Sequence, residues 1–237
     1  MLLSINIDHI ATLRNARGEQ EPEPIVAAQI CERAGADGIV VHLREDRRHI
    51  RDADVYLLRD ILKTKLDLEM SANEEIIKIA LDVKPDLVTL VPEKRLELTT
   101  EGGLDVFAQK DNLKKVIDRF HEKNISVSLF VDPIEKQIIA AKEICADIIE
   151  IHTGEFANAK NNNEQIFHLK NISEMAKFAS SINLHVNAGH GLNYKNVTSI
   201  AQISEIQESS IGHAIISRAV WVGLEKAVKE MLELVKS

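Results

Sequence analysis

Nine histidines are distributed unevenly along the 237-residue chain. Six of them stand at or just after the end of a short apolar segment typical of a buried strand, namely His9, His42, His49, His152, His190 and His213. Imidazole exchanges protons near neutral pH, so these residues suit general acid and base catalysis. One histidine in such a position is as often structural as functional, but six at equivalent positions predict a site of proton transfer.

Acids and amides occupy the same kind of position. They include Asn6, Asp8, Glu69 and Glu150. Metal ligation by Asp8, His9, His42 and Glu69 is possible in principle, although the chain contains neither His-x-His nor HExxH. No lysine lies at a strand end, so a Schiff base formed by the protein has little support.

A strongly basic segment follows the second apolar run. Residues 41–52 contain Arg44, Arg47, Arg48, His49 and Arg51. Guanidinium groups match phosphate oxygens well, so this segment could hold a phosphorylated substrate. We expect Arg47, Arg48 and Arg51 to pair with the acids of the same solvated loop, which leaves Arg44 as the main candidate. Arg17, in the expected loop after the first strand, is a second candidate.

Two glycine-containing turns follow the last two apolar segments. Asn187–Gly191 reads NAGHG, and Ile211–His213 reads IGH. Glycine lets the backbone approach an anion closely, and backbone N–H groups at such turns often bind phosphate in barrel enzymes. Neither GxxxxGK[ST] nor GxGxxG is present, so nucleotide binding has no support.

Elements that end at one rim would be needed to bring these residues together. Strands are expected at Leu2–Ile7, Gly38–Leu43, Leu66–Met70, Leu87–Val91, Ser126–Val131, Asp147–Ile151, Leu184–Asn187 and Glu205–Ile211. Helical spacing of apolar residues predicts helices at Pro24–Arg33, Ala53–Lys63, Asn73–Val83, Asn112–Lys123, Ile134–Ile144, Glu164–Ser180, Tyr194–Ala201 and Val222–Val235.

This alternation predicts an α/β fold, a single (β/α)8 TIM barrel over residues 1–237 with extra short helices. Each unit has about 30 residues, the size of a βα repeat. Strands that are apolar almost throughout suit a buried parallel sheet, and eight strands close a barrel, whereas open sheets commonly use about five or six. The connection Glu93–Asp111 is long, so we expect it to hold an extra short helix or a lid.

Composition excludes several function classes. The 37 acidic residues outnumber the 29 Lys and Arg, which argues against a general nucleic-acid or membrane-surface binder. Two cysteines, Cys31 and Cys145, are too few for a disulfide framework. The N-terminal segment lacks a basic signal-peptide region, and no apolar run is long enough to cross a bilayer. We therefore expect a cytoplasmic protein.

Several long motifs resemble the pyridoxine 5′-phosphate synthase family. They are NIDHIATLRNARG (Asn6–Gly18), AGADGIVVHLREDRRHI (Ala34–Ile50), LVPEKR…TTEGGLDV (Leu90–Val106), EIHTG (Glu150–Gly154), VNAGHGLNY (Val186–Tyr194) and IGHAII (Ile211–Ile216). The resemblance covers essentially the whole chain. It implies a (β/α)8 barrel with extra helices that assembles as a homo-octamer, a tetramer of dimers.

The resemblance also implies a reaction between two phosphorylated substrates. In this family, 3-amino-2-oxopropyl phosphate (1-amino-acetone 3-phosphate) condenses with 1-deoxy-D-xylulose 5-phosphate to give pyridoxine 5′-phosphate, inorganic phosphate and water. Neither a metal nor an organic cofactor is implied. The substrate supplies the amine, which agrees with the lack of a lysine at the strand ends.

Residue roles follow from the resemblance alone. His42 and Glu69 would accept protons. His190 would donate a proton, and Glu150 would stabilise a transition state. Contacts to deoxyxylulose phosphate would come from Asp8, His9, Arg44, His49 and Thr99. Contacts to the amino-ketone phosphate would come from Asn6, Arg17, Gly191, Gly212 and His213.

Three alternatives stay open at the level of sequence. Another phosphosugar barrel enzyme, such as an aldolase, isomerase or epimerase, would share the phosphate sites but would not need two substrates. A metal-dependent hydrolase would use Asp8, His9 and His42 and would lose activity with a chelator. A non-enzymatic ligand-binding or assembly protein would not need the histidines.

Overall fold

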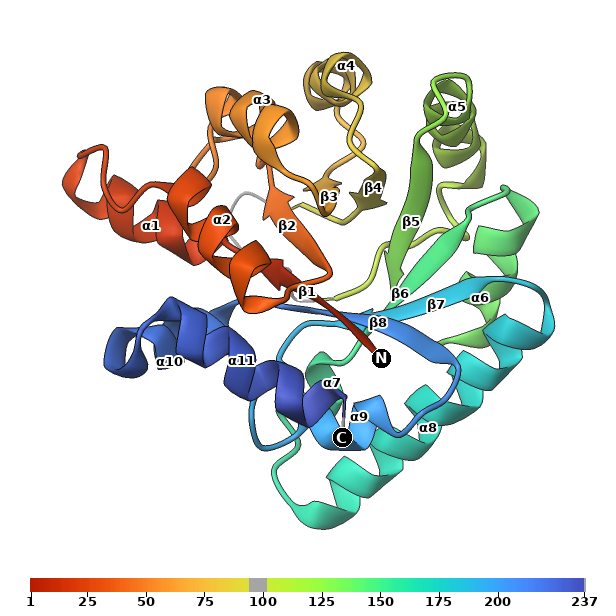
Figure 1. Ribbon diagram of the computed structural model, residues 1–237. Helices are drawn as coiled ribbons and strands as arrows, with labels where there is room; N and C mark the ends of the chain where they lie inside the picture. Colours follow the sequence, from red (N-terminus) through yellow and green to blue (C-terminus); the bar gives the residue numbers. More distant parts are fainter. Residues whose placement is uncertain (94–101, 237) are drawn as a thin grey trace.

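The computed structural model describes residues 1–93 and 102–236. Eight parallel strands close into a barrel in chain order, with β1 paired to β8 (Figure 1). The strands are β1 Leu2–Asn6, β2 Gly38–His42, β3 Lys65–Met70, β4 Leu87–Leu90, β5 Ser126–Val131, β6 Ile148–His152, β7 His185–Gly189 and β8 Ile206–Ile211. The predicted (β/α)8 barrel is therefore confirmed.

Helices surround the closed sheet (Figure 1). Those in the described ranges are α1 Asp8–Arg17, α2 Pro24–Ala34, α3 Asp52–Ile61, α4 Glu74–Val83, α5 Lys110–His121, α6 Glu135–Glu143, α7 Gly154–Ala157, α8 Asn162–Ser181, α9 Val197–Ala201, α10 His213–Val222 and α11 Leu224–Val235. Since helices return the chain to the start of the next strand, all strands end at one rim. No helix among the described residues is long and apolar enough to cross a membrane.

The hydrophobic core lies between the sheet and the helices rather than inside the barrel. In β3, Leu66, Leu68 and Met70 belong to this core, whereas Asp67 and Glu69 alternate with them. Successive strand residues point to opposite faces, so the acids of β3 face the barrel interior. The expectation of strands that are apolar almost throughout is thus wrong for the inward face.

Polar side chains lie in the lower barrel interior, and several of them hydrogen-bond to one another. Ser4 Oγ donates to Glu208 Oε1 at 2.6 Å, and Lys65 Nζ contacts the same carboxylate at 2.6 Å. One layer above, Thr89 Oγ1 donates to Asp67 at 2.9 Å. Burial raises the pKa of Asp67 to about 7, which places a titrating acid directly beneath the strand ends.

Three helices lack a counterpart in the sequence-based expectations, and each has a physical reason. Helix α1 buries Asp8, Ala11 and Arg14, so its inward face is polar and gives no apolar periodicity. Helix α10 buries only Ile215 and exposes apolar residues near its end. Helix α7 has four residues, too few for periodicity to appear.

The long connection Glu93–Asp111 is only partly described. Residues 94–101, which include Thr99, lie outside the described residues, so the expected lid is not tested. Residues 102–109 form bends and turns, and α5 begins at Lys110. The last helix begins at Leu224 rather than Val222, because Gly223 adopts a φ of 84° between α10 and α11.

Candidate active site

A cavity of about 360 Å³ opens at the rim where the strands end. Of the residues predicted from the sequence, it is lined by Asn6, Asp8, His9, His42, Arg44, His49, Glu69, Glu150, His190, Gly191, Gly212 and His213. The structure therefore brings together side chains from both ends of the chain. Arg17 does not line the cavity. It lies exposed at the end of α1, not in a loop as expected, and Thr99 lies outside the described residues.

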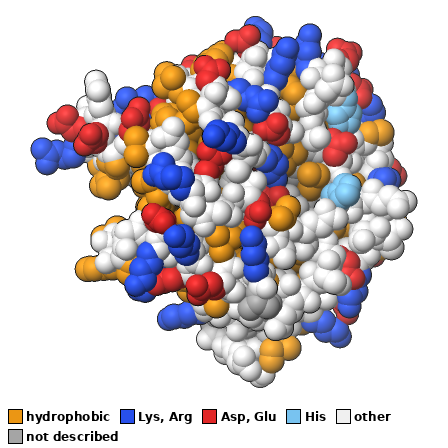
Figure 2. Space-filling model, in the orientation of Figure 1, with side chains coloured by type: hydrophobic (Ala, Val, Ile, Leu, Met, Phe, Trp, Pro, Cys, Tyr) orange, Lys and Arg blue, Asp and Glu red, His pale blue; other side chains and the backbone are white. Residues whose placement is uncertain are grey.

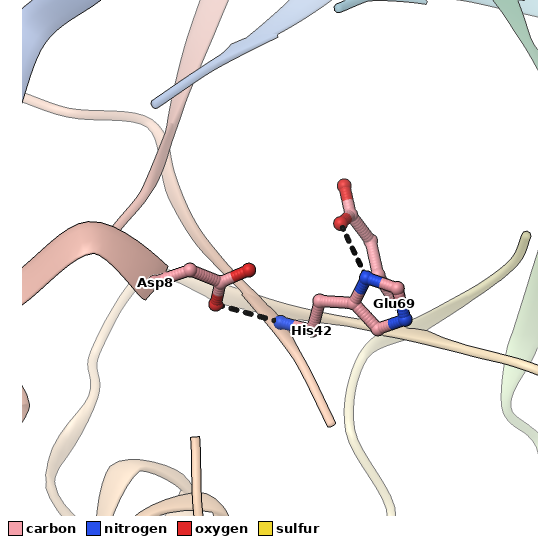
Figure 3. A group of neighbouring side chains, drawn as sticks. All are labelled: Asp8, His42 and Glu69. Carbon is pink, nitrogen blue, oxygen red and sulfur yellow. Dashed lines mark hydrogen bonds and ion pairs between the residues drawn. The ribbon is translucent and has the colours of Figure 1, made fainter. Parts of the chain in front are cut away.

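The first three strands contribute a cluster of Asp8, His42 and Glu69 (Figure 3). Asp8 begins α1, and its backbone N–H donates to Asn6 Oδ1 at 3.0 Å. One carboxylate oxygen of Asp8 accepts the backbone N–H of His42 at 2.9 Å. Glu69, the second neighbour of His42, places its Oε2 atom 3.9 Å from His42 Nδ1. The end of β1 thus fixes the backbone on which the His42 imidazole stands.

His42 is held in its neutral form. Its side chain is buried, and burial together with the Arg44 guanidinium lowers its pKa well below the usual value. Its Nε2 atom has no hydrogen-bond partner among the described residues, although Glu93 Oε2 lies 3.9 Å away. A neutral imidazole with a free nitrogen in a cavity can accept a proton.

Two buried carboxyl groups have raised pKa values, so they tend to keep a proton. Burial raises the pKa of Glu69 well above its usual value, and the nearby charges of Glu150 and Asp8 raise it further. Burial and the charge of Asp67 likewise raise the pKa of Glu150. Two close carboxyl groups cannot both ionise easily, so this pair retains a proton near neutral pH.

Gly189 carries no side chain, and this leaves room for the carboxylate of Glu150. A Cβ atom built on Gly189 would lie 1.9 Å from Glu150 Oε1, so the carboxylate occupies the space that any other residue at 189 would fill. The paired register of β6 and β7 sets Glu150 beside Asn187, two residues before this glycine. Gly189 is therefore required for the position of the carboxylate.

One end of the cavity offers unsatisfied donors to an anion. Arg44 is buried, its Nε has no hydrogen-bond partner among the described residues, and its Nη1 lies 3.9 Å from Glu93 Oε1. His49 Nδ1 is likewise buried without a partner in the described part of the chain. Burial, with the Arg44 charge, lowers the pKa of His49 to about 4. A bound phosphate dianion would balance the charge of Arg44 and would raise the pKa of His49 again.

The other arginines of the segment 41–52 behave largely as expected. Arg47 pairs with Asp52 and Glu75, and Arg48 pairs with Asp46. Arg51 differs, because its Nη2 donates to Asn15 Oδ1 at 2.9 Å rather than to an acid of its own loop. Within residues 1–93 and 102–236, Arg44 is the only arginine that lines the cavity.

The opposite end of the cavity presents backbone rather than guanidinium groups. Helix α10 begins at His213, directly after Gly212, so its first N–H groups face the cavity. A Cβ atom on Gly212 would lie 3.0 Å from Asn6, and Gly191 adopts a φ of 78°. Both glycines leave the backbone accessible to a ligand.

The comparisons with known proteins agree with this geometry. A family model described as pyridoxal phosphate biosynthesis protein PdxJ matches residues 3–237. A pyridoxine 5′-phosphate synthase of Geobacter sp. (strain M21) is 56% identical over 234 residues, covering 99% of this chain and 98% of that relative. The chain belongs to the pyridoxine 5′-phosphate synthase family. Another relative of this name, from Chlorobium phaeobacteroides, is 55% identical over 236 residues and covers 100% of both chains.

Solved structures of low sequence identity share the fold of this member of the pyridoxine 5′-phosphate synthase family. A thiamine phosphate pyrophosphorylase from Pyrococcus furiosus superposes with a TM-score of 0.64 at 15% identity, covering 99% of this chain and 95% of that one. A structure described as native KDPGal gives a TM-score of 0.68 at 12% identity and covers 100% and 95%. These two similarities concern the barrel alone.

Several residues of this family member's site were not predicted from its sequence. Phe130 lines the cavity floor, and Glu93 approaches both His42 and Arg44. A buried pair joins α1 to α3, because Arg14 donates to both oxygens of Asp54 at 2.8 Å. The two partners are 40 residues apart, so no local pattern indicates this contact.

A metal ion would compete with protons for this site. Within the described residues, potential ligand atoms of Asp8, His42 and Glu69 lie within 4.8 Å of one another, and His9 is not part of that group. Burial raises the pKa of Asp8 to about 6 and raises the pKa of Glu69 well above its usual value. Since metal ligands must be deprotonated, a metal ion would have to displace the proton of Glu69.

Proposed function

We propose that this cavity condenses 3-amino-2-oxopropyl phosphate with 1-deoxy-D-xylulose 5-phosphate to give pyridoxine 5′-phosphate, inorganic phosphate and water. The observation that carries the proposal is the combination of groups that line one cavity. Two sets of anion-binding groups share it with a buried histidine whose pKa is lowered, His42, and a buried carboxyl whose pKa is raised, Glu69. Family membership supports the same reaction.

The deoxyxylulose phosphate is assigned to the end that holds Arg44 and His49. Their unpartnered nitrogens supply donors for phosphate oxygens. The ring centroids of His9 and His49 lie 6.1 Å apart, which places His9 beside the same group. Asp8 is positioned to bind a hydroxyl of this substrate. Thr99 remains a predicted contact.

The amino-ketone phosphate is assigned to the end formed by Asn6, Gly191, Gly212 and His213. The backbone N–H groups at the start of α10 favour negative charge there. The rings of His9 and His213 meet edge to face at 5.1 Å, so His9 lies beside a group of each phosphate-binding end. Arg17 is retained as a predicted ligand of this phosphate, although it does not line the cavity of its own chain.

The chemistry requires imine formation, dehydrations and ring closure, which are a series of proton transfers. His42 is assigned as one proton acceptor, because its imidazole is neutral and its Nε2 has no hydrogen-bond partner among the described residues. Glu69 accepts a second proton when it is ionised, and its raised pKa makes it a stronger base than an exposed glutamate. His190 has a pKa lowered to about 4 by burial, so a proton placed on it is given up readily. Glu150 is assigned to stabilise a transition state, and its raised pKa of about 8 lets the protonated carboxyl donate a hydrogen bond.

No cofactor or metal is proposed for this reaction. The amino-ketone brings its own amine, so the imine that joins the two substrates needs no lysine of the protein. The partners are thus two small phosphorylated molecules, with neither nucleic acid nor a membrane involved. A cytoplasmic location fits the supply of such substrates.

The chain is also proposed to assemble as a homo-octamer, a tetramer of dimers. Support comes from large apolar side chains on two neighbouring helices. Leu13 on α1 is 59% exposed, and Val220 and Trp221 on α10 are 72% and 81% exposed. Figure 2 shows hydrophobic side chains on the two projections that α1 and α10 form. Light scattering of the parent and of Trp221→Glu tests whether this surface joins copies.

The reaction is tested by mixing the purified protein with both substrates and following pyridoxine 5′-phosphate by its absorbance. Product is expected only when both substrates are present, and a chelator should not reduce the rate. Conversion of either substrate alone would favour a phosphosugar aldolase, isomerase or epimerase. Loss of activity with chelator would favour a metal-dependent enzyme, and no turnover at all would favour a binding protein.

A further inference from the structure

A carboxylate–histidine pair lies directly behind His190. Asp132 follows β5 and His152 ends β6, two strands whose paired register brings these residues side by side. His152 Nδ1 and Asp132 Oδ1 are 2.9 Å apart. The same carboxylate oxygen accepts the backbone N–H of Gly103 at 2.9 Å. Asp132 is therefore fixed from two directions.

His152 is buried but does not line the cavity. Its side chain is 8% exposed, and its Nε2 atom has no hydrogen-bond partner among the described residues. The ring packs at 5.0 Å, edge to face, against His190 and at 5.2 Å against Phe130, which do line the cavity. One layer of side chains thus separates His152 from a ligand.

The hydrogen bond to Asp132 decides which nitrogen of His152 carries the proton. Donation from His152 lowers the pKa of Asp132, so the carboxylate is ionised and accepts. Nδ1 therefore carries a proton and donates it to the carboxylate. A Cβ atom on Gly154 would lie 2.3 Å from His152 Nε2 and 3.2 Å from His190 Cδ2, so the Nε2 atom and the edge of the His190 ring lie near the same point.

We propose that Asp132 and His152 are positioning residues for His190, the residue assigned as proton donor. This inference rests on the proposed function of His190. The pair holds the imidazole of His190 in one orientation through the edge-to-face contact with the His152 ring. His152 also adds to the effect of burial in lowering the pKa of His190, so the contact favours release of a proton from that imidazole.

The backbone around His190 supports the same conclusion. His190 adopts a φ of 76°, which is rare for a residue with a side chain, and Thr153 Oγ1 donates to its carbonyl at 2.6 Å. A second hydrogen bond from Thr153 Oγ1 reaches the carbonyl of Gly189 at 2.9 Å. The chain holds the backbone of His190 in a costly conformation, and the imidazole is then oriented by His152.

A matched control lies at the other end of β6. His121 Nε2 and Asp147 Oδ2 are 2.8 Å apart, and Asp147 also accepts the backbone N–H of Val127 at 2.8 Å. This pair has the same chemistry as His152 and Asp132 and a similar backbone anchor. Asp147 directly precedes β6 and His121 ends α5, so this pair lies at the opposite end of the strands from the cavity.

The test compares His152→Phe with His121→Phe, alone and combined with His190→Asn. We expect His152→Phe to lower kcat on the order of 10-fold to 10²-fold, with KM for both substrates within about threefold of the parent. His121→Phe should leave both unchanged. In the His190→Asn background, His152→Phe should have no further effect on kcat, because its action passes through His190. Asp132→Asn, which preserves shape, should reproduce a part of the loss.

Three results would overturn the inference. One is a parent-like kcat in both His152→Phe and Asp132→Asn. Another is a loss in His152→Phe that is equally large when His190 is already replaced. The third is a rise of both KM values with kcat unchanged. If His190→Asn alone turns over normally, the proposed role of His190 fails instead. Should His152→Phe not fold, Asp132→Asn carries the same comparison.

Discussion

Replacement of Asp67 by Asn tests the electrostatic origin of the raised pKa values in the barrel. Asp67 is buried beneath Glu69, and Thr89 Oγ1 donates to its two oxygens at 2.9 and 3.0 Å. Its pKa is raised by burial from 3.8 to about 7. The folded state therefore binds this proton more tightly than the unfolded state, and the parent loses stability as pH rises from about 4 through 7.

The magnitude follows from the same values. Each tenfold change in proton affinity is worth about 1.4 kcal/mol, so the raised pKa of Asp67 costs the folded state about 2 kcal/mol at pH 5 and about 4 kcal/mol at pH 8. Asp67→Asn removes this cost. The variant should gain stability over the parent by about 2 kcal/mol more at pH 8 than at pH 5. An unfavourable contact of the amide would lower the stability of the variant equally at both pH values. The diagnostic quantity is therefore the change with pH in the stability difference between variant and parent.

Urea unfolding at one protein concentration measures this difference, because assembly would otherwise contribute to the apparent stability. Asp60→Asn, at an exposed position of α3, is the matched control. Asp67 also raises the pKa of Glu69 and of Glu150, so the variant should begin to turn over at a lower pH than the parent. A stability difference that is the same at pH 5 and pH 8 would refute the reasoning.

Three further changes probe single contacts. Arg44→Lys keeps the charge but loses the guanidinium fork, so KM for deoxyxylulose phosphate should rise about 10-fold or more in initial-rate kinetics, and an unchanged KM would remove Arg44 from the site. Gly189→Ala would place a Cβ atom 1.9 Å from Glu150 Oε1 and would displace that carboxylate. We expect kcat to fall on the order of 10²-fold with an unaltered circular dichroism spectrum, whereas normal turnover would show that glycine is not required at position 189. Arg14→Ala leaves Asp54 buried without its partner and should cost about 3–5 kcal/mol in urea unfolding, whereas a cost below about 1 kcal/mol would show that the pair contributes little.

Much of the fold could be predicted from the sequence because its outward-facing strand residues and its helices follow simple periods. All eight strands lie within about two residues of the expected bounds. The errors concern faces that carry polar residues. Helix α1 turns Asp8 and Arg14 inward, and Asp54, the buried partner of Arg14, lies on α3. Hydrophobic periodicity could therefore not reveal helix α1.

The site was predictable to the extent that its residues stand at strand ends. A barrel brings such positions to one rim, so His42, Glu69 and His190 converge although nearly 150 residues separate the first from the last. Contacts that depend on side-chain reach were not predictable. The approach of Glu93 to His42 and the pairing of His152 with Asp132 require coordinates.

In the proposed reaction, a buried carboxyl cluster at the barrel rim moves protons between two bound phosphorylated substrates. Glu69→Gln is the decisive variant, because the amide keeps the shape of the side chain but cannot accept a proton. Calorimetric binding of each substrate and steady-state turnover should be measured on the same preparation. We predict dissociation constants within about threefold of the parent and a kcat reduced on the order of 10²-fold or more. Turnover equal to that of the parent would contradict this role of the cluster, and the proton acceptor would then have to be His42 alone.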